Sequence, residues 1–151
     1  FPSKARIYEG LIDFIEDALF SRISTIVKDA PDTQERCRMI VTLLLSFSEK
    51  NPGLSRILSG DALTGETERL HTRVNQLFTR IEAQIKQVLR EGELRENCRT
   101  HLLASATAEL LLVIAEGKIR QYVRSNFTSL PTNHWQEQWA ALEDAIYLRP
   151  T

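Results

Sequence analysis

Apolar residues recur at every third or fourth position along almost all of this chain, and this spacing constrains the fold more than any other feature. It is the period of an α-helix with one buried face, whereas a half-buried strand alternates apolar and polar residues. Only 6 glycines and 5 prolines interrupt the pattern in 151 residues. The sequence therefore predicts an all-α fold without a β-strand.

Prolines and capping residues divide the pattern into helices. Pro31 ends one helix, and Asp32 with Glu35 three residues later forms a capping box that starts the next. Asn51 before Pro52 is typical of the cap and first residue of a short helix. We expect six helices around one core, at about residues 7–28, 33–50, 52–58, 65–90, 101–125 and from 131 onward, with a loop or frayed helix end at 92–100.

Two of these helices carry unusual apolar faces. The second is apolar almost all round between residues 40 and 47, which is typical of a helix enclosed by its neighbours. The last places Trp135, Trp139, Leu142 and Ile146 on one face. Such an aromatic face needs a partner surface.

Charge and cysteine content exclude several classes of protein. The 19 Lys and Arg residues against 20 Asp and Glu residues give a net charge of −1, so the whole chain has no general attraction for nucleic acid or acidic membranes. The longest apolar run, 110–115, is far shorter than the roughly 20 residues of a membrane span. Cys37 and Cys98 fit no zinc spacing, which favours free thiols in a reducing cytoplasm.

No motif in the sequence predicts catalysis, a metal site or a cofactor. His71, His101 and His134 lie far apart and have no metal-binding spacing around them. Glu68 and His71 have the Glu-x-x-His spacing of di-iron bundles, but such a site needs two copies. Nucleophile elbows and glycine-rich phosphate loops are also missing, so we expect a protein without enzymatic activity.

Arg69, Arg73 and Arg80 could form a stripe that follows a phosphate backbone. Glu66, Glu68 and Glu82 interleave with them and would cancel much of the field. We therefore expect a solvated, mixed-charge helix face.

Several segments resemble a branch of the TetR-family regulators that inhibits cell division by nucleoid occlusion. The matching segments are spread along the chain from residue 1 to residue 125 and are 1–6, 11–17, 51–54, 56–58, 73–78, 80–84 and 123–125. The resemblance implies that residues 1–151 form one TetR-type C-terminal regulatory and dimerisation domain. Because the chain opens on Phe1-Pro2-Ser3-Lys4, without an initiator methionine, we expect the helix-turn-helix DNA-binding domain to lie upstream and to be absent here.

The resemblance also implies a function and a site. Proteins of this branch bind the C-terminal tail of FtsZ when they are loaded on DNA, and so block assembly of the Z-ring over the chromosome. The positions that match the tail-binding residues are Phe14, Arg22, Leu43, Lys50 and Asn51. Ser46 replaces a glycine of the family in this groove and Lys50 replaces an arginine, which removes a bidentate grip on a carboxylate.

Further expectations follow from the family. Lys4 matches a lysine that touches DNA phosphate at the start of the first helix of this domain. The last two long helices pair with those of a second copy as a four-helix bundle, which would give Tyr122, Trp135, Trp139 and Ile146 a partner. The expected location is the bacterial cytoplasm, at the nucleoid.

Two alternative functions remain open from the residues. An ordinary ligand-responsive TetR repressor would hold a small molecule in a core cavity and move the first long helix. A simple dimerisation module would bind neither the FtsZ tail nor a small molecule.

Overall fold

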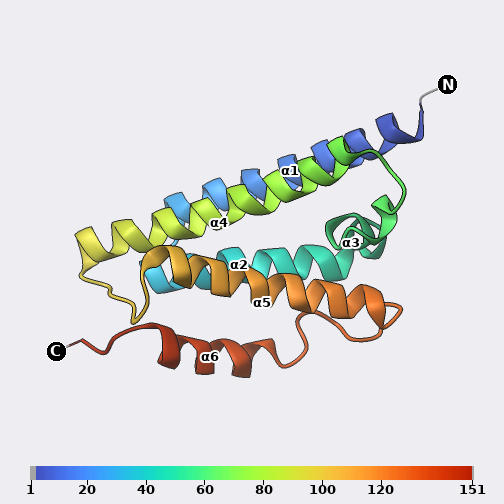
Figure 1. The fold of residues 1–151 in the computed structure, drawn as a ribbon. Coiled ribbons are helices and arrows are strands. Elements are labelled where there is room, and N and C mark those ends of the chain that lie inside the picture. Colours follow the sequence, from blue (N-terminus) through green and yellow to red (C-terminus); the bar gives the residue numbers. More distant parts are fainter. Residues whose placement is uncertain (1–2, 151) are drawn as a thin grey trace.

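The computed structural model describes residues 3–150, so Phe1 and Pro2 of the resembling opening segment lie outside the described residues. The regular structure of the described residues is helical, apart from a single antiparallel bridge between Thr100 and Tyr147. The elements are α1 (Lys4–Asp29), α2 (Thr33–Lys50), α3 (Pro52–Leu58), the 3-10 turn η1 (Asp61–Leu63), α4 (Glu68–Glu96), α5 (Ala104–Arg124) and α6 (Trp135–Ile146) (Figure 1). The prediction of six α-helices is confirmed.

The Asp32 cap starts α2 where the sequence predicts it, whereas α1 begins at Lys4, three residues before its expected start. The Ser3 hydroxyl accepts a hydrogen bond from the Arg6 amide at the start of α1. The Asp32 carboxylate accepts one of 2.9 Å from the Glu35 amide at the start of α2. These bonds satisfy amide groups that would have no partner within their own helix. The Glu35 side chain does not complete the capping box, because it pairs with Arg38.

Helix α4 continues beyond its expected end at about residue 90, and the expectation of a loop or frayed helix end at 92–100 is wrong for residues 92–96. The helix runs to Glu96 and ends at Asn97, which adopts the left-handed conformation with φ 54°. Contacts with α2 explain the extension. The Glu96 carboxylate accepts hydrogen bonds from the backbone amide of Thr33, at 3.0 Å, and from its hydroxyl, at 2.9 Å.

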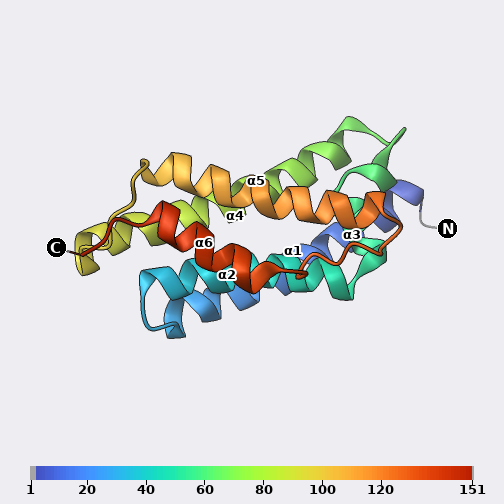
Figure 2. The ribbon, with the colours of Figure 1, turned by 90° about the horizontal axis from the view of Figure 1, so that it is seen from below.

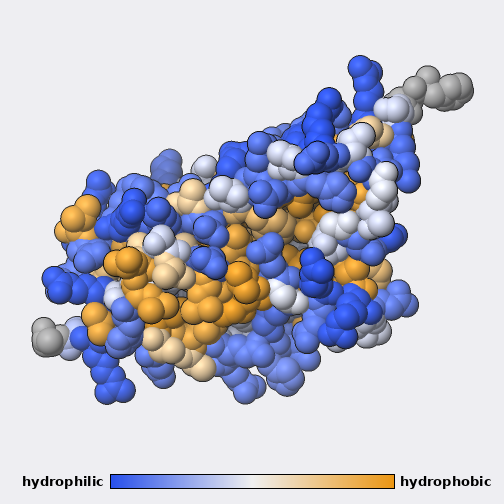
Figure 3. Space-filling view, in the orientation of Figure 1, coloured by the Kyte–Doolittle hydropathy of each residue, from blue (hydrophilic) through white to orange (hydrophobic). Residues whose placement is uncertain are grey.

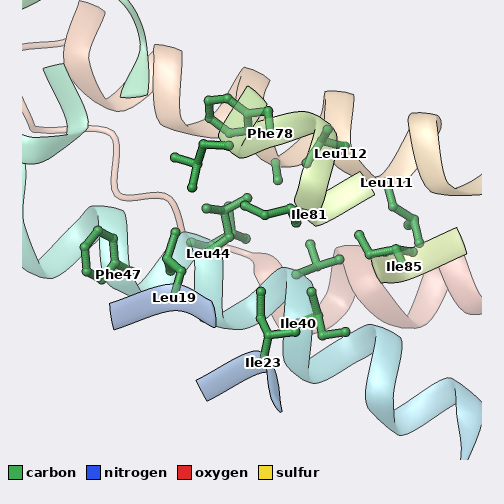
Figure 4. Close-up of a cluster of buried hydrophobic side chains, with 14 of the residues drawn as sticks. Leu19, Ile23, Ile40, Leu44, Phe47, Phe78, Ile81, Ile85, Leu111 and Leu112 are labelled. Carbon is green, nitrogen blue, oxygen red and sulfur yellow. The ribbon is translucent and has the colours of Figure 1, made fainter. Parts of the chain in front are cut away.

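The helices form two layers. α1 and α4 lie side by side along one face of the molecule, α2 and α5 lie beneath them, and α6 crosses the outer side of α2 and α5 (Figures 1 and 2). α2 packs against α1, α3, α4 and α5, which confirms the prediction of an enclosed central helix. The core lies between the layers and includes the buried side chains of Leu19, Ile40, Ile81 and Leu111 (Figure 4).

A row of ion pairs joins α1 to α4. Arg73 Nη2 lies 2.7 Å from Asp13 Oδ1 and 2.9 Å from Glu16 Oε1. Two further pairs are Arg69 with Glu9 and Arg80 with Glu16. The three arginines therefore face acidic residues of another helix, which corrects the expectation that acids interleaved on the same helix balance their charge.

Candidate functional site: the groove between α1 and α2

The groove forms because α1 and α2 are antiparallel and are joined by a short turn at residues 30–32 (Figures 1 and 2). Each helix buries one face in the core and leaves a second face beside its neighbour. On α1 the groove wall includes residues 11, 22, 25 and 29, with Phe14 one turn after Leu11 on the same helix, and on α2 it includes 35, 39, 42, 46 and 50. Steps of three, four, seven or eight residues keep each set on one side of its helix.

Three surface hollows follow this line. The Lys50 hollow, of about 540 Å³, lies at the junction with α3 and is lined by residues including Tyr8, Leu11, Lys50, Asn51 and Leu54. The Arg22 hollow, of about 450 Å³, is lined by Arg22, Thr25, Ile26, Arg38, Met39, Thr42, Leu43 and Ser46. The Asp29 hollow, of about 420 Å³, lies at the turn and is lined by residues including Asp29, Asp32, Glu35 and Met39. We call the three together the α1–α2 groove.

The predicted binding residues fall along this groove in two pairs and one single residue. Arg22 and Leu43 line the same hollow from opposite helices. Lys50 and Asn51 line the next hollow. Phe14 lies on α1 between the two, lines neither, and leaves 56% of its surface exposed. A phenylalanine this exposed contributes little to the fold and offers a large apolar area to a partner.

Asn51 has a structural role that differs from the predicted one. Its side chain makes no capping hydrogen bond to α3. The side-chain Nδ2 instead donates 2.8 Å to the carbonyl oxygen of Phe47, and its own carbonyl accepts from the amide and hydroxyl of Ser55. These bonds fix the sharp turn from α2 to α3 and so hold Lys50 at the rim of its hollow.

Arg38 is a groove residue that the sequence did not single out. Its Nε donates 2.9 Å to Glu35 Oε2, and its Nη2 pairs with the other carboxylate oxygen of the same residue. The hydrogen bonds from Arg38 lower the pKa of the Glu35 carboxyl, and the same bonds raise the pKa of Arg38. The i, i+3 spacing of Glu35 and Arg38 is the only sequence signal for this pair.

The back of α2 is held by the segment that leads into α6. The backbone amide and hydroxyl of Thr132 donate to Glu49 Oε1, at 3.2 and 2.6 Å. Trp135 Nε1 donates 2.9 Å to the hydroxyl of Thr42, which itself lines the Arg22 hollow. The groove wall is therefore braced by α6 from behind.

The aromatic residues predicted for the dimer interface lie inside the chain's own core. The exposed fractions of Tyr122, Trp135, Trp139 and Ile146 do not exceed 6%. Side chains already buried in one chain have almost no area left to bury against a second copy. This assignment is corrected, and the partner that the aromatic face needs is α2 and α5 of the same chain (Figure 2).

An exposed apolar surface does lie on α5 and the segment before it. Figure 3 shows a continuous hydrophobic patch over α5 and beside α6. Leu103 is 79% exposed, and Leu102, Leu110 and Val113 are also exposed. We call these four residues the α5 patch.

Lys4 lies at the start of α1, with 71% of its side chain exposed. Its Nζ is 3.4 Å from Glu66 Oε2, so the positive charge is partly neutralised within the chain. The three histidines are exposed, and no group of three or more His, Cys, Asp or Glu side chains within residues 3–150 is placed to hold a metal ion. No helix among the described residues is long and apolar enough to cross a membrane.

Comparisons with known proteins identify the family. Residues 31–147 match the family model of the SlmA-like, tetracyclin repressor-like C-terminal domain. The nucleoid occlusion factor SlmA of Shewanella amazonensis is 55% identical over 146 residues, which are 97% of this chain and 74% of that protein. SlmA of Shewanella denitrificans is 53% identical and that of Shewanella baltica 54%, each over the same shares of both chains. The chain therefore belongs to the SlmA family of nucleoid occlusion factors, and its fold is that family's TetR-like C-terminal domain.

Proposed function

We propose that this chain inhibits cell division by binding the C-terminal tail of FtsZ in the α1–α2 groove, and so blocks assembly of the Z-ring over the chromosome. One observation carries the proposal. Four of the five residues that the family resemblance assigns to tail binding, Arg22, Leu43, Lys50 and Asn51, line two hollows of this one groove, and the fifth, Phe14, is exposed on α1 beside them. Nothing in the spacing of the sequence alone requires this arrangement.

The groove suits a short peptide that combines apolar and acidic residues. Apolar surface is available at Phe14, Leu43 and Leu11, and the cations Arg22 and Lys50 lie at its rim. Apolar contacts provide most of the affinity in such complexes, while the charges select the partner and speed its association. No reaction is involved, because the tail is held and not modified.

Two substitutions relative to the family adjust this site without removing it. Lys50 offers a single ammonium group where arginine offers a planar fork, so it attracts a carboxylate without fixing its orientation. Ser46 lines the Arg22 hollow and is half-buried. Its hydroxymethyl group narrows that hollow compared with glycine.

The active form in this proposal is a homodimer. The α5 patch provides exposed apolar surface on the face where the α5 helices of two copies would meet. An exposed apolar patch of this kind is typical of an interface between subunits. The α5 patch and the α1–α2 groove have no residue in common, so dimerisation and tail binding use separate surfaces in this proposal.

DNA activates the inhibitor through a domain outside these 151 residues. The relatives are longer than the matched segment, which covers 74% of the Shewanella amazonensis protein. Lys4 lies at the N-terminal end of α1, where helix charge and the lysine together favour a phosphate. We assign Lys4 a contact with the DNA backbone, and we expect the protein to act at the nucleoid in the bacterial cytoplasm.

The competing repressor hypothesis requires a ligand cavity in the core. Side chains of α1, α2, α4 and α5 pack together there (Figure 4), and the three groove hollows open to the surface. These observations favour a peptide on the surface over a small molecule inside. A simple dimerisation module would show no binding in the following experiment.

The proposal is tested by fluorescence anisotropy with a labelled FtsZ C-terminal tail peptide. The wild-type chain should bind it saturably, and Phe14→Ala and Lys50→Glu should each weaken binding by about tenfold or more. Leu94→Ala and Arg90→Glu are matched controls, since both residues are exposed on α4, away from the groove. Absence of binding by the folded wild-type dimer, or equal binding by all four variants, would overturn the proposal.

A further inference from the structure

The Arg22 hollow receives a guanidinium group from each of its two walls. Arg22 comes from α1 and Arg38 from α2, and the apolar side chains of Ile26, Met39 and Leu43 line the same hollow. No ion pair of Arg22 occurs among residues 3–150. A cation without a partner, at the edge of an apolar hollow, favours an incoming carboxylate.

Arg38 is held in a defined orientation by Glu35. The two bonds to Glu35 use Nε and Nη2, and both oxygens of the carboxylate take part. Arginine carries five N–H donors in a rigid plane, so this pairing leaves Nη1 and one hydrogen of Nη2 for a second acceptor. Among the described residues, no acceptor is hydrogen-bonded to Nη1. The Arg38 side chain keeps 40% of its surface exposed, so a ligand can reach it.

The neighbouring hollow limits where an acidic side chain can lie. The Asp29 hollow is lined by the carboxylates of Asp29, Asp32 and Glu35, which repel another carboxylate. The Lys50 hollow at the other end carries Lys50, and its second cation, Arg56, is already paired with Asp61 at 2.9 Å. An acidic peptide can therefore place carboxylates over the Lys50 and Arg22 hollows, and the Arg22 hollow is the last position before the repulsive end.

We propose that Arg38 is a specificity-determining residue of the α1–α2 groove, and that Arg22 and Arg38 together clamp one carboxylate side chain of the acidic peptide that binds there. Glu35 acts as a positioning residue, because it fixes the plane of the Arg38 guanidinium. This inference rests on the proposed function, in which such a peptide occupies the groove. It adds to that function an anchor for one carboxylate at the Arg22 hollow. It also predicts that the acidic residues of the peptide do not extend into the Asp29 hollow.

The clamp is tested by a double-mutant cycle between the protein and the peptide, measured by anisotropy. Arg38→Ala should raise the dissociation constant about tenfold, and Arg38→Lys should fall between Ala and wild type because the charge remains and the fork is lost. A series of tail peptides is then prepared, each with one Asp or Glu replaced by its amide. One of these peptides should bind the wild-type chain about tenfold more weakly than the unmodified peptide does. The affinity of that peptide should not fall further when the chain carries Arg38→Ala.

Failure of the Arg38 clamp and failure of the proposed function give different results in this experiment. Arg90→Ala is the matched control, because Arg90 is exposed on α4 outside the groove, and it should bind like wild type. If wild type binds the peptide and Arg38→Ala binds equally well, the clamp is wrong and the proposed function stands. If wild type binds no peptide, the proposed function fails first. Circular dichroism of each variant shows that the fold is intact.

Discussion

Trp135 Nε1 donates a hydrogen bond of 2.9 Å to the hydroxyl of Thr42, and so joins the first residue of α6 to the wall of the Arg22 hollow. The bond links the helix that was expected to face a second copy with the helix that lines the groove. The last helix therefore supports the candidate binding site from within the same chain.

Removing this bond should destabilise the fold and loosen the groove. Trp135→Phe keeps an aromatic ring but loses the indole N–H, and we expect the free energy of unfolding to fall by about 1–2 kcal/mol. Thr42→Val removes the same bond from the other side. In urea denaturation the double variant should lose less than the sum of the two single variants. Fully additive losses would show that the bond contributes nothing.

Gly92 should tolerate no side chain. A Cβ at this position would lie 2.6 Å from Thr33 Cγ2, because α4 packs closely on the start of α2. We expect Gly92→Ala to cost about 1–3 kcal/mol of unfolding free energy by overpacking. Gly10→Ala is the control, since nothing lies within 4 Å of its added Cβ. That change should stabilise α1 by about 0.5–1 kcal/mol, and equal effects of the two substitutions would contradict the packing described.

The two cysteines should differ in reactivity. Burial raises the pKa of the Cys37 thiol to about 12, while Cys98 is half-buried. In the native protein at pH 8, iodoacetamide should label Cys98 slowly and leave Cys37 intact, since the thiolate is the reactive form. Mass spectrometry identifies the labelled site. Labelling of Cys37 at the rate of Cys98 would contradict its burial.

The same pKa predicts a loss of stability in alkali. Between about pH 9 and 12 the unfolded thiol is ionised and the folded Cys37 thiol keeps its proton, so unfolding releases a proton. Stability should therefore fall as pH rises, by up to about 1.4 kcal/mol per pH unit from this group. Cys37→Ala should show a shallower decline than wild type over this range. Parallel curves would rule out this linkage.

The α5 patch should hold two copies together. Val113→Glu places a charge in the proposed interface, and we expect it to shift the protein from dimer to monomer in analytical ultracentrifugation. Leu94→Glu is the control, because Leu94 is 85% exposed on α4, away from the patch. A Val113→Glu dimer as tight as wild type would exclude this surface as the interface.

The sequence predicted helix ends well where the residues that fix them are close together in the chain. The cap at Asp32 and the proline at 52 depend on neighbouring residues, and α2 and α3 lie at their expected bounds, while α1 begins three residues before its expected start. The end of α4 depends on Thr33, which is 63 residues from Glu96. This long-range contact explains why residues 92–96 are helical where a loop or frayed helix end was expected. α6 begins at Trp135 and not near Pro131, because residues before it bind Glu49 of α2.

The surfaces were harder to predict than the helices. An apolar face shows that Trp135 and Trp139 need a partner, but it does not distinguish the same chain from a second copy. The partners of Arg73 also lie on another helix, about sixty residues away. The candidate site depended on the family resemblance, and Arg38 escaped it because its groove position follows from packing alone.

Binding of the FtsZ tail in the α1–α2 groove is tested most directly by amide chemical-shift mapping. The isotope-labelled chain is titrated with unlabelled FtsZ C-terminal tail peptide. We expect the largest shifts to cluster along the α1–α2 groove, at residues 11–26 and 38–51. The outer face of α4 should remain unperturbed. Shifts confined to the α5 patch or to the core, or no shifts at saturating peptide, would contradict the proposed site.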